Sequence, residues 1–282
     1  MPNIDLTRVR RISAFRRIAI GTWHTAYDPT VYGTVRVRME EAERYIAAFR
    51  QATGRKLTIT HLVTAAVARG LGECPELNGL LRFNRLYRRN SVDVSVVVLV
   101  SGDEGGDLST ATLRGADQMS LVEMLDSMDE QVSGFRSGRN EALKRTKGAL
   151  QLVPLPLMNF FLKLIAFLNY DLNLDLTWLG LPKDPFGAAT ITSIGSLGLD
   201  TAYVPLVSYS RVPLFVAPGV VQDAAVVEDG EVVPGRILEV HASFDHRYID
   251  GVHAMTLSRM VHKVLEHPFD ELDPLPPAPS DP

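Results

Sequence analysis

The segment Ser243-Phe244-Asp245-His246-Arg247-Tyr248-Ile249-Asp250-Gly251 decides how this chain is interpreted. An apolar run from Arg236 to Ser243 leads into it, and an amphipathic stretch from Val252 to His267 follows it. This pattern predicts a strand, then a loop that carries His246 and an acid four residues later, then a helix released by Gly251. The sequence therefore places a histidine in a loop at the end of a strand.

Two interpretations of His246 are open on these residues alone. It is either a structural histidine beside a surface ion pair or a general base. The second interpretation rests on chemistry, because an imidazole with an unperturbed pKa near 6.5 is well suited to remove a proton at neutral pH. The spacing between His246 and Asp250 does not decide between the two.

The string Asp245-His246-Arg247-x-x-Asp250-Gly251 resembles the active-site signature of the dihydrolipoamide acyltransferases, the core component of 2-oxoacid dehydrogenase complexes. More distantly, it resembles that of chloramphenicol acetyltransferase. Segments 11–18, 74–78 and 116–121 are similar to the same family, and the likeness covers about residues 8 to 268. The resemblance implies an α/β fold (α+β sandwich) of the chloramphenicol acetyltransferase type. It also implies a mixed sheet flanked by helices and a homotrimer with active sites between subunits.

The resemblance also implies roles for individual residues. His246 would be the general base, and Thr192 of a neighbouring subunit would donate a hydrogen bond to the oxyanion, with Ser193 as the alternative donor. Arg11 would form an ion pair with Asp250, since a bidentate guanidinium suits a carboxylate that must stay fixed. From the residues alone, the run around Thr192 predicts only a strand with hydroxyl groups on its edge.

Composition limits the classes of function. With 46% hydrophobic and 22% charged residues among 282, the chain is typical of an ordinary globule with a full core. A net charge of -4 does not provide the positive electrostatic potential that attracts nucleic acid. The single cysteine, Cys74, excludes an internal disulfide framework and favours a cytoplasmic protein, and we interpret it as a small core residue. No metal is expected.

Periodicity and capping signals predict the elements around the signature. Ser120 and Glu123 form a capping box that starts a helix lasting to about Phe135. Apolar and polar residues alternate over Val31–Arg38, which predicts a half-buried strand. Gly54 marks the end of one helix and Thr58 the start of the next. The remaining expectations are a helix over 39–52, a helix over 59–72, a buried strand over 92–100, a hairpin of 214–227 with 232–240, and an inward face of the last helix made by Val252, Leu257, Met260, Val261, Val264 and Leu265.

The sequence predicts one acyltransferase domain over residues 1–268, with an apolar insertion at 149–186 and a proline-rich tail at 269–282. Prolines, asparagines and a lysine interrupt the insertion, so no run approaches the roughly 20 apolar residues that span a bilayer. The insertion is then a helix buried against the core or between subunits, a membrane-surface contact, or a lid over an acyl chain. The first of these is the simplest, so we expect no membrane partner.

The expected activity is acyl transfer between coenzyme A and a dihydrolipoyl-type thiol or another small acceptor, with acyl-coenzyme A as a substrate. We find no lipoyl domain and no peripheral-subunit-binding domain in the sequence, so a lipoyl group would come in trans. Three hypotheses remain open: a stand-alone acyltransferase, a dehydrogenase-complex core that acts on a lipoyl domain of another chain, and a non-catalytic scaffold. The homotrimer could assemble further into a cubic particle.

Overall fold

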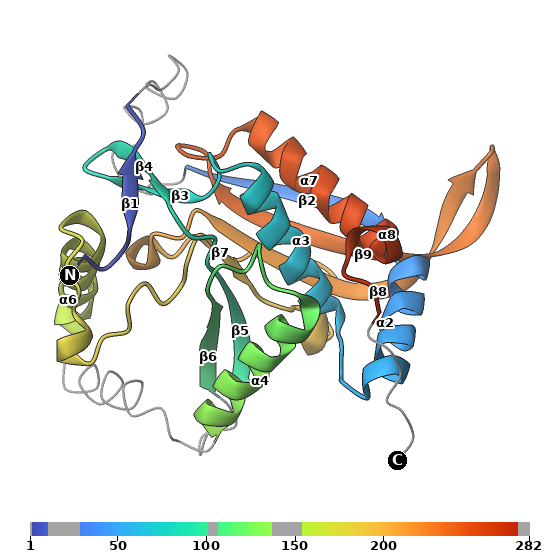
Figure 1. The fold of residues 1–282 in the computed structure, drawn as a ribbon. Coiled ribbons are helices and arrows are strands. Elements are labelled where there is room, and N and C mark those ends of the chain that lie inside the picture. Colours follow the sequence, from blue (N-terminus) through green and yellow to red (C-terminus); the bar gives the residue numbers. More distant parts are fainter. Residues whose placement is uncertain (1, 11–28, 101–106, 137–153, 276–282) are drawn as a thin grey trace.

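The computed structural model describes residues 2–10, 29–100, 107–136 and 154–275 (Figure 1). Its centre is a six-stranded mixed sheet in the order β2-β9-β8-β7-β5-β6. Strands β5, β7 and β8 run parallel to one another, whereas β2, β9 and β6 pair antiparallel with their neighbours. The strands are β2 (Thr30–Arg38), β5 (Val94–Val100), β6 (Asp107–Leu113), β7 (Ala189–Ile191), β8 (Leu214–Glu228) and β9 (Glu231–Asp245).

Helices cover one face of this sheet (Figure 1). Their inward side chains join those of the sheet in one hydrophobic core, in which Phe49, Leu62, Met124 and Leu265 are almost fully buried. The mixed sheet flanked by helices confirms the predicted fold class. The helices are α2 (Glu40–Thr53), α3 (Ile59–Glu73), α4 (Leu121–Arg136), α7 (Gly251–Glu266) and α8 (Pro268–Glu271).

The predicted signals at the helix ends are present. Gly54 ends α2 with a positive φ of 68°, a conformation that costs glycine little. Ser120 accepts a hydrogen bond from the Glu123 amide, while the Glu123 carboxylate accepts one from the Ser120 amide, so the capping box opens α4. Thr58 caps α3 as expected, but its reciprocal partner is His61, which the sequence pattern did not identify.

One predicted core position in the last helix is wrong. Met260, Val261, Val264 and Leu265 are buried in α7, as expected, whereas Val252 is 68% exposed. Val252 precedes Met260 by eight residues, which displaces its side chain by about 80° around the helix. It therefore leaves the inward stripe at the first turn.

A second, three-stranded antiparallel sheet lies beside the first. It has the order β1-β4-β3, with β1 at Leu6–Arg8, β4 at Arg85–Arg89 and β3 at Gly79–Arg82. A small cluster formed by Ile4, Leu80, Ala166 and Tyr170 packs this sheet against helix α6 (Leu155–Ala166) and the following η1 turn (Phe167–Asp171). Figure 1 shows α6 at this edge of the molecule.

Helix α6 belongs to the apolar insertion, and most of it does not pack on the core of its own chain. Ala166 is buried, but four large apolar side chains of the helix are exposed: Leu157, Phe160, Phe161 and Leu164. None of the helices in the described ranges is both long and apolar enough to cross a bilayer. Burial between subunits, membrane-surface contact and a lid remain as interpretations of this face.

Candidate active site

The loop that follows β9, residues 245–250, is called the signature loop below. Its backbone is tied to two neighbouring segments, because the Asp245 amide donates to the carbonyl of Pro213 (2.9 Å) and the His246 amide to that of Pro29 (2.8 Å). The Arg247 guanidinium binds both carboxylate oxygens of Asp245, with Nη2 at 2.6 Å and Nε at 3.0 Å from its nearer oxygen. Both side chains are only 12% exposed. A bidentate, largely buried pair therefore holds the loop on either side of His246.

The ring of His246 is oriented by the same loop. Its Nδ1 lies 2.9 Å from the carbonyl oxygen of Ile249. A carbonyl oxygen only accepts, so Nδ1 carries the proton and donates it in this hydrogen bond. The neutral ring then has its lone pair on Nε2, the arrangement that a general base needs.

Asp250 is the N-cap of α7. Its Oδ1 accepts hydrogen bonds from the amides of Val252 and His253, each at 3.1 Å, and lies 2.6 Å from Nδ1 of His253. On the far side of the imidazole, Nε2 of His253 is 3.3 Å from Glu76. Sequence reasoning missed His253, although the i, i+3 spacing of a capping box was visible. Arg11, the expected partner of Asp250, lies outside the described residues.

Tyr248 fixes the loop against the small sheet. It is buried, and its hydroxyl group lies over Gly79 at the start of β3. A Cβ atom at position 79 would overlap both this hydroxyl and the carbonyl oxygen of Tyr87. Glycine is therefore required for the signature loop to pack here.

The two candidate hydroxyls follow β7. The Thr192 amide donates to the carbonyl of Val216 (2.9 Å), which continues the β7–β8 pairing. Among the described residues, the Thr192 hydroxyl has no hydrogen-bond partner. The Ser193 hydroxyl accepts from the Ser196 amide at 3.3 Å and so takes part in the next turn. That bond uses a lone pair of Ser193 and not its proton, so both hydroxyls remain candidate donors to a ligand.

Strand register separates Thr192 from His246 within one chain. Ile191 pairs with Val216 and Ala217 pairs with His241, so Thr192 is level with His241 on β9. His246 comes five residues after His241 and directly follows the last residue of β9. At about 3.4 Å per residue this is roughly 17 Å. The structure therefore does not bring the predicted base and the predicted oxyanion donor together in one subunit.

A cavity of about 560 Å³ opens beside the signature loop. It is bounded by α6, by the segment 206–213, by β3 and by the loop itself, and is called the α6 pocket below. The lining side chains from α6 and from the loop are Asn159, Lys163, Ala166, Asp245, Arg247 and Tyr248. No spacing in the sequence indicated this pocket, because its walls come from four distant segments.

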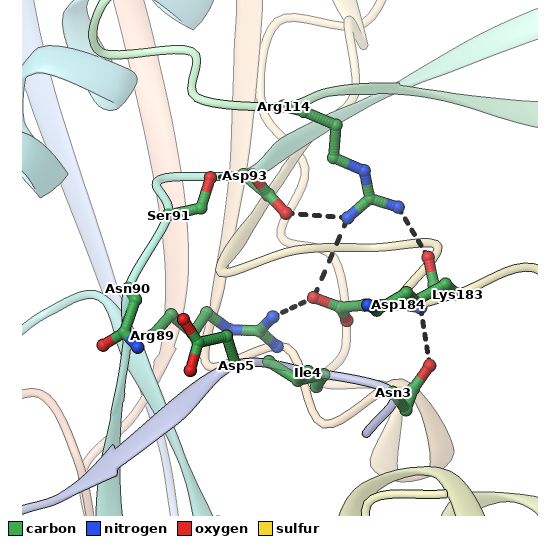
Figure 2. Close-up of a pocket in the computed structure, with 10 residues that line it drawn as sticks. All are labelled: Asn3, Ile4, Asp5, Arg89, Asn90, Ser91, Asp93, Arg114, Lys183 and Asp184. Carbon is green, nitrogen blue, oxygen red and sulfur yellow. Dashed lines mark hydrogen bonds and ion pairs between the residues drawn. The ribbon is translucent and has the colours of Figure 1, made fainter. Parts of the chain in front are cut away.

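A second cavity, of about 400 Å³, surrounds a network of ion pairs at the end of the insertion (Figure 2). Arg89 and Asp184 form an ion pair with side chains only 2% and 4% exposed. Arg114 binds Asp93 at 2.7 Å and the carbonyl oxygen of Lys183 at 2.5 Å. Burial lowers the pKa of Arg89 more than any other single cause, but the charge and hydrogen bond of Asp184 act together with Tyr170 and Asp93, and the net pKa is raised. The network therefore fixes residues 183–184, shortly before β7.

Comparison with known proteins gives one family. The family model described as 2-oxoacid dehydrogenases acyltransferase (catalytic domain) matches residues 5–151 and 186–272 and leaves 152–185 unmatched. A Bacillus subtilis relative is the dihydrolipoyllysine-residue acetyltransferase component of the pyruvate dehydrogenase complex. It is 24% identical over 90% of this chain and 48% of its own length. This chain thus spans about half the length of the curated relatives it matches.

Two solved structures are similar in fold. The Azotobacter vinelandii dihydrolipoamide acetyltransferase has a TM-score of 0.63 at 20% identity, with 93% of each chain covered. A chloramphenicol acetyltransferase has a TM-score of 0.51 at 11% identity, covering 93% of this chain and all of that one. Both likenesses concern the arrangement of the sheet and helices.

Proposed function

Because this chain belongs to the 2-oxoacid dehydrogenase acyltransferase (catalytic domain) family, we propose that it transfers an acyl group between coenzyme A and a thiol. The curated relatives are named as dihydrolipoyllysine-residue acetyltransferases, which supports coenzyme A thioesters and a dihydrolipoyl-type thiol as substrates. The chain spans only part of those relatives, so the substrates are part of the proposal.

The reaction proceeds by direct attack. A thiol with a pKa near 8.5 is mostly protonated at pH 7, so Nε2 of His246 takes its proton as the sulfur attacks the thioester carbonyl. A new carbon–sulfur bond forms and the carbonyl oxygen becomes an oxyanion. When the oxyanion collapses, the bond to the coenzyme A sulfur breaks and the leaving thiolate takes the proton from His246. No acyl-enzyme forms and no oxidant is consumed.

The oxyanion is stabilised by the hydroxyl group of Thr192 from a neighbouring subunit. Register places Thr192 roughly 17 Å along the strands from the His246 of its own chain, which supports a site built from two copies. The loss of one such donor typically costs about a hundredfold or more in rate. Asp250 holds the loop on α7 and exchanges no proton.

The hydrogen bond from Nδ1 of His246 to the carbonyl of Ile249 carries this proposal. It selects the tautomer in which Nε2 carries the lone pair and is able to accept a proton. In the Azotobacter vinelandii enzyme, a serine, a histidine and an asparagine have been investigated for their role in the catalytic mechanism. A hydroxyl group and a histidine are the two reacting groups proposed here.

The assembly is proposed to be a homotrimer that acts in the cytoplasm. The Bacillus subtilis relative is a component of a pyruvate dehydrogenase complex, which supports assembly with other components; a lipoyl domain supplied in trans and further assembly into a cubic core are parts of the proposal. A trimer or a multiple of three is expected from light scattering, and a stable monomer would contradict it.

The test is consumption of acetyl-coenzyme A with dihydrolipoamide as the acceptor, measured on the wild type and on His246→Ala. We expect turnover in the wild type and at least a hundredfold loss in the variant, whose circular dichroism spectrum should be unchanged. Normal turnover in His246→Ala would refute the role of His246. If the wild type shows no turnover with any of a panel of acyl donors and thiols, a non-catalytic scaffold would instead be favoured.

A further inference from the structure

Helix α6 is apolar on nearly every side, yet it lies at the surface of the molecule. Its only polar residues are Asn159 and Lys163. A helix that is apolar all round is normally buried in a core or in contact with lipid. Figure 1 shows α6 at the edge of the fold, and of its described side chains only Ala166 is buried. The apolar surface that remains is therefore a candidate contact with a partner.

The exposed apolar side chains of α6 form one continuous stripe. Leu157, Phe160, Phe161 and Leu164 follow one another at i, i+3, i+4 and i+7, which places them on one face of the helix. They are 49%, 62%, 37% and 38% exposed, in this order. Ala166, nine residues after Leu157, lies about 180° around the helix from it. The stripe therefore faces away from the rest of the protein.

Two more exposed aromatic rings lie at the end of α6. Phe167 is 41% exposed, and Phe83, in the turn between β3 and β4, is 54% exposed. Their ring centroids are 6.2 Å apart in an edge-to-face arrangement. Arg82 donates a hydrogen bond to the backbone carbonyl of Asp171 in the η1 turn, which ties the β3–β4 turn to the end of the helix. The helix and the turn are thus neighbours on the surface.

The charge of these two neighbours is positive. Helix α6 and the turn 82–85 contain Lys163, Arg82 and Arg85 and no acidic residue. The carboxylate of Asp171 is only 10% exposed and is paired with Arg211. The whole chain carries a net charge of -4, so this excess of cations is local. The sequence that joins α4 to α6 adds four cations and one acid: Arg139, Lys144, Arg145, Lys147 and Glu141.

An apolar stripe beside a set of cations fits the surface of an anionic bilayer. Helices of this kind bury the stripe at the boundary of head groups and acyl chains, while their cations contact anionic lipids. At 1.5 Å per residue, the twelve residues of α6 span about 18 Å, less than the roughly 30 Å of a hydrocarbon core. A second copy of the chain fits less well, because a symmetric contact would bring the same three cations together with no acid between them.

We propose that α6 and the β3–β4 turn dock this protein on an anionic lipid bilayer. The stripe enters the boundary of the acyl chains, and Lys163, Arg82 and Arg85 contact lipid phosphates. The interruptions from which the sequence predicted no membrane partner exclude a span, but they do not exclude a helix that lies along the surface. This docking goes beyond the proposed acyl transfer and does not depend on it.

Co-flotation with lipid vesicles tests the proposal on the whole chain. Vesicles of phosphatidylcholine are compared with vesicles that also contain phosphatidylglycerol, over a range of lipid concentrations. We expect binding to the anionic vesicles to be at least about tenfold tighter and to weaken as salt is added, because salt screens the ionic attraction. No binding to the anionic vesicles would overturn the proposal.

The double variant Phe160→Gln, Phe161→Gln removes the centre of the stripe and keeps good helix formers. Its binding to anionic vesicles should be at least about tenfold weaker, since two aromatic side chains lose their contact with the acyl chains. The matched control is Val227→Gln with Val232→Gln. These valines are 72% and 71% exposed and pair near the tip of the β8–β9 hairpin, which projects on the opposite side of the molecule (Figure 1). The control should bind as the wild type does, and equal binding by both double variants would reject the role of α6.

Charge and self-association are tested separately. Arg85→Gln should weaken binding to anionic vesicles about fivefold, the effect of one cation near the lipid surface. Lys56→Gln should leave it unchanged, because Lys56 is exposed between α2 and α3, away from α6. Light scattering should give the same mass for the wild type and for Phe160→Gln, Phe161→Gln. A smaller oligomer in that variant would assign the stripe to a contact between copies and reject the proposal.

Discussion

Two inactive variants should restore each other if His246 and Thr192 act from different subunits. His246→Ala and Thr192→Ala each remove one member of the pair, and every chain of a mixture then carries one lesion. The two groups lie roughly 17 Å apart along the strands of one chain, so a working site must draw them from two copies. In randomly mixed rings of equal composition, about a quarter of the sites receive His246 from one variant and Thr192 from the other.

The assay is co-expression of the two variants with different affinity tags, followed by purification on both tags in succession. Acetyl-coenzyme A consumption is followed by chromatography, because the acceptor is itself a thiol. Purification on both tags removes the unmixed trimers, and each mixed trimer has one complete site among its three, so we expect roughly a third of the wild-type rate, against about 1% or less for either variant alone. A mixture no more active than its components, with mixed oligomers shown by mass spectrometry, would refute a site shared between subunits.

Three further predictions concern stability and are checked by urea unfolding. Burial lowers the pKa of His61 from 6.5 to about 4, so the unfolded chain takes up this proton first as pH falls. The free energy of unfolding of the wild type should therefore fall by up to about 3 kcal/mol between pH 6.5 and 4. In His61→Gln, which keeps the capping box, the fall should be smaller by that amount. Parallel plots of unfolding free energy against pH for the two proteins would contradict this. Asp184→Asn should cost about 3–5 kcal/mol because it leaves a buried guanidinium unpaired, and a cost below 1 kcal/mol would show that Arg89 reaches water. Gly79→Ala should cost about 3 kcal/mol or more, because the new Cβ would overlap the backbone carbonyl of Tyr87 as well as the Tyr248 hydroxyl, and an unchanged midpoint would argue against these contacts.

The fold was predictable because its signals are local. The capping box at Ser120, the glycine that ends α2 and the alternation along β2 each depend on a few neighbouring residues, and each is present in the structure. Val252 was misplaced. A step of eight residues back from Met260 turns about 80° around the helix, so helical periodicity itself puts Val252 off the buried stripe, whereas its neighbour His253 is buried in the same first turn.

The candidate site was predictable only in part. The signature places His246 at the end of β9, and the structure adds the hydrogen bond to Ile249 that orients it. His253 and Arg247 were missed as partners of the loop carboxylates, because resemblance drew attention to Arg11. The α6 pocket could not be predicted, since helix α6 and the signature loop are about eighty residues apart in the chain and only tertiary packing joins them.

The pairing of Arg89 with Asp184 has a consequence for how such a chain can change over generations. It fixes the backbone just before β7, so the preceding residues can gain, lose or exchange side chains while the strand that leads to Thr192 keeps its place. Variation in the insertion is thereby separated from the groups proposed to perform the chemistry. A lineage could thus remodel the exposed face of α6 without moving the groups proposed to be catalytic.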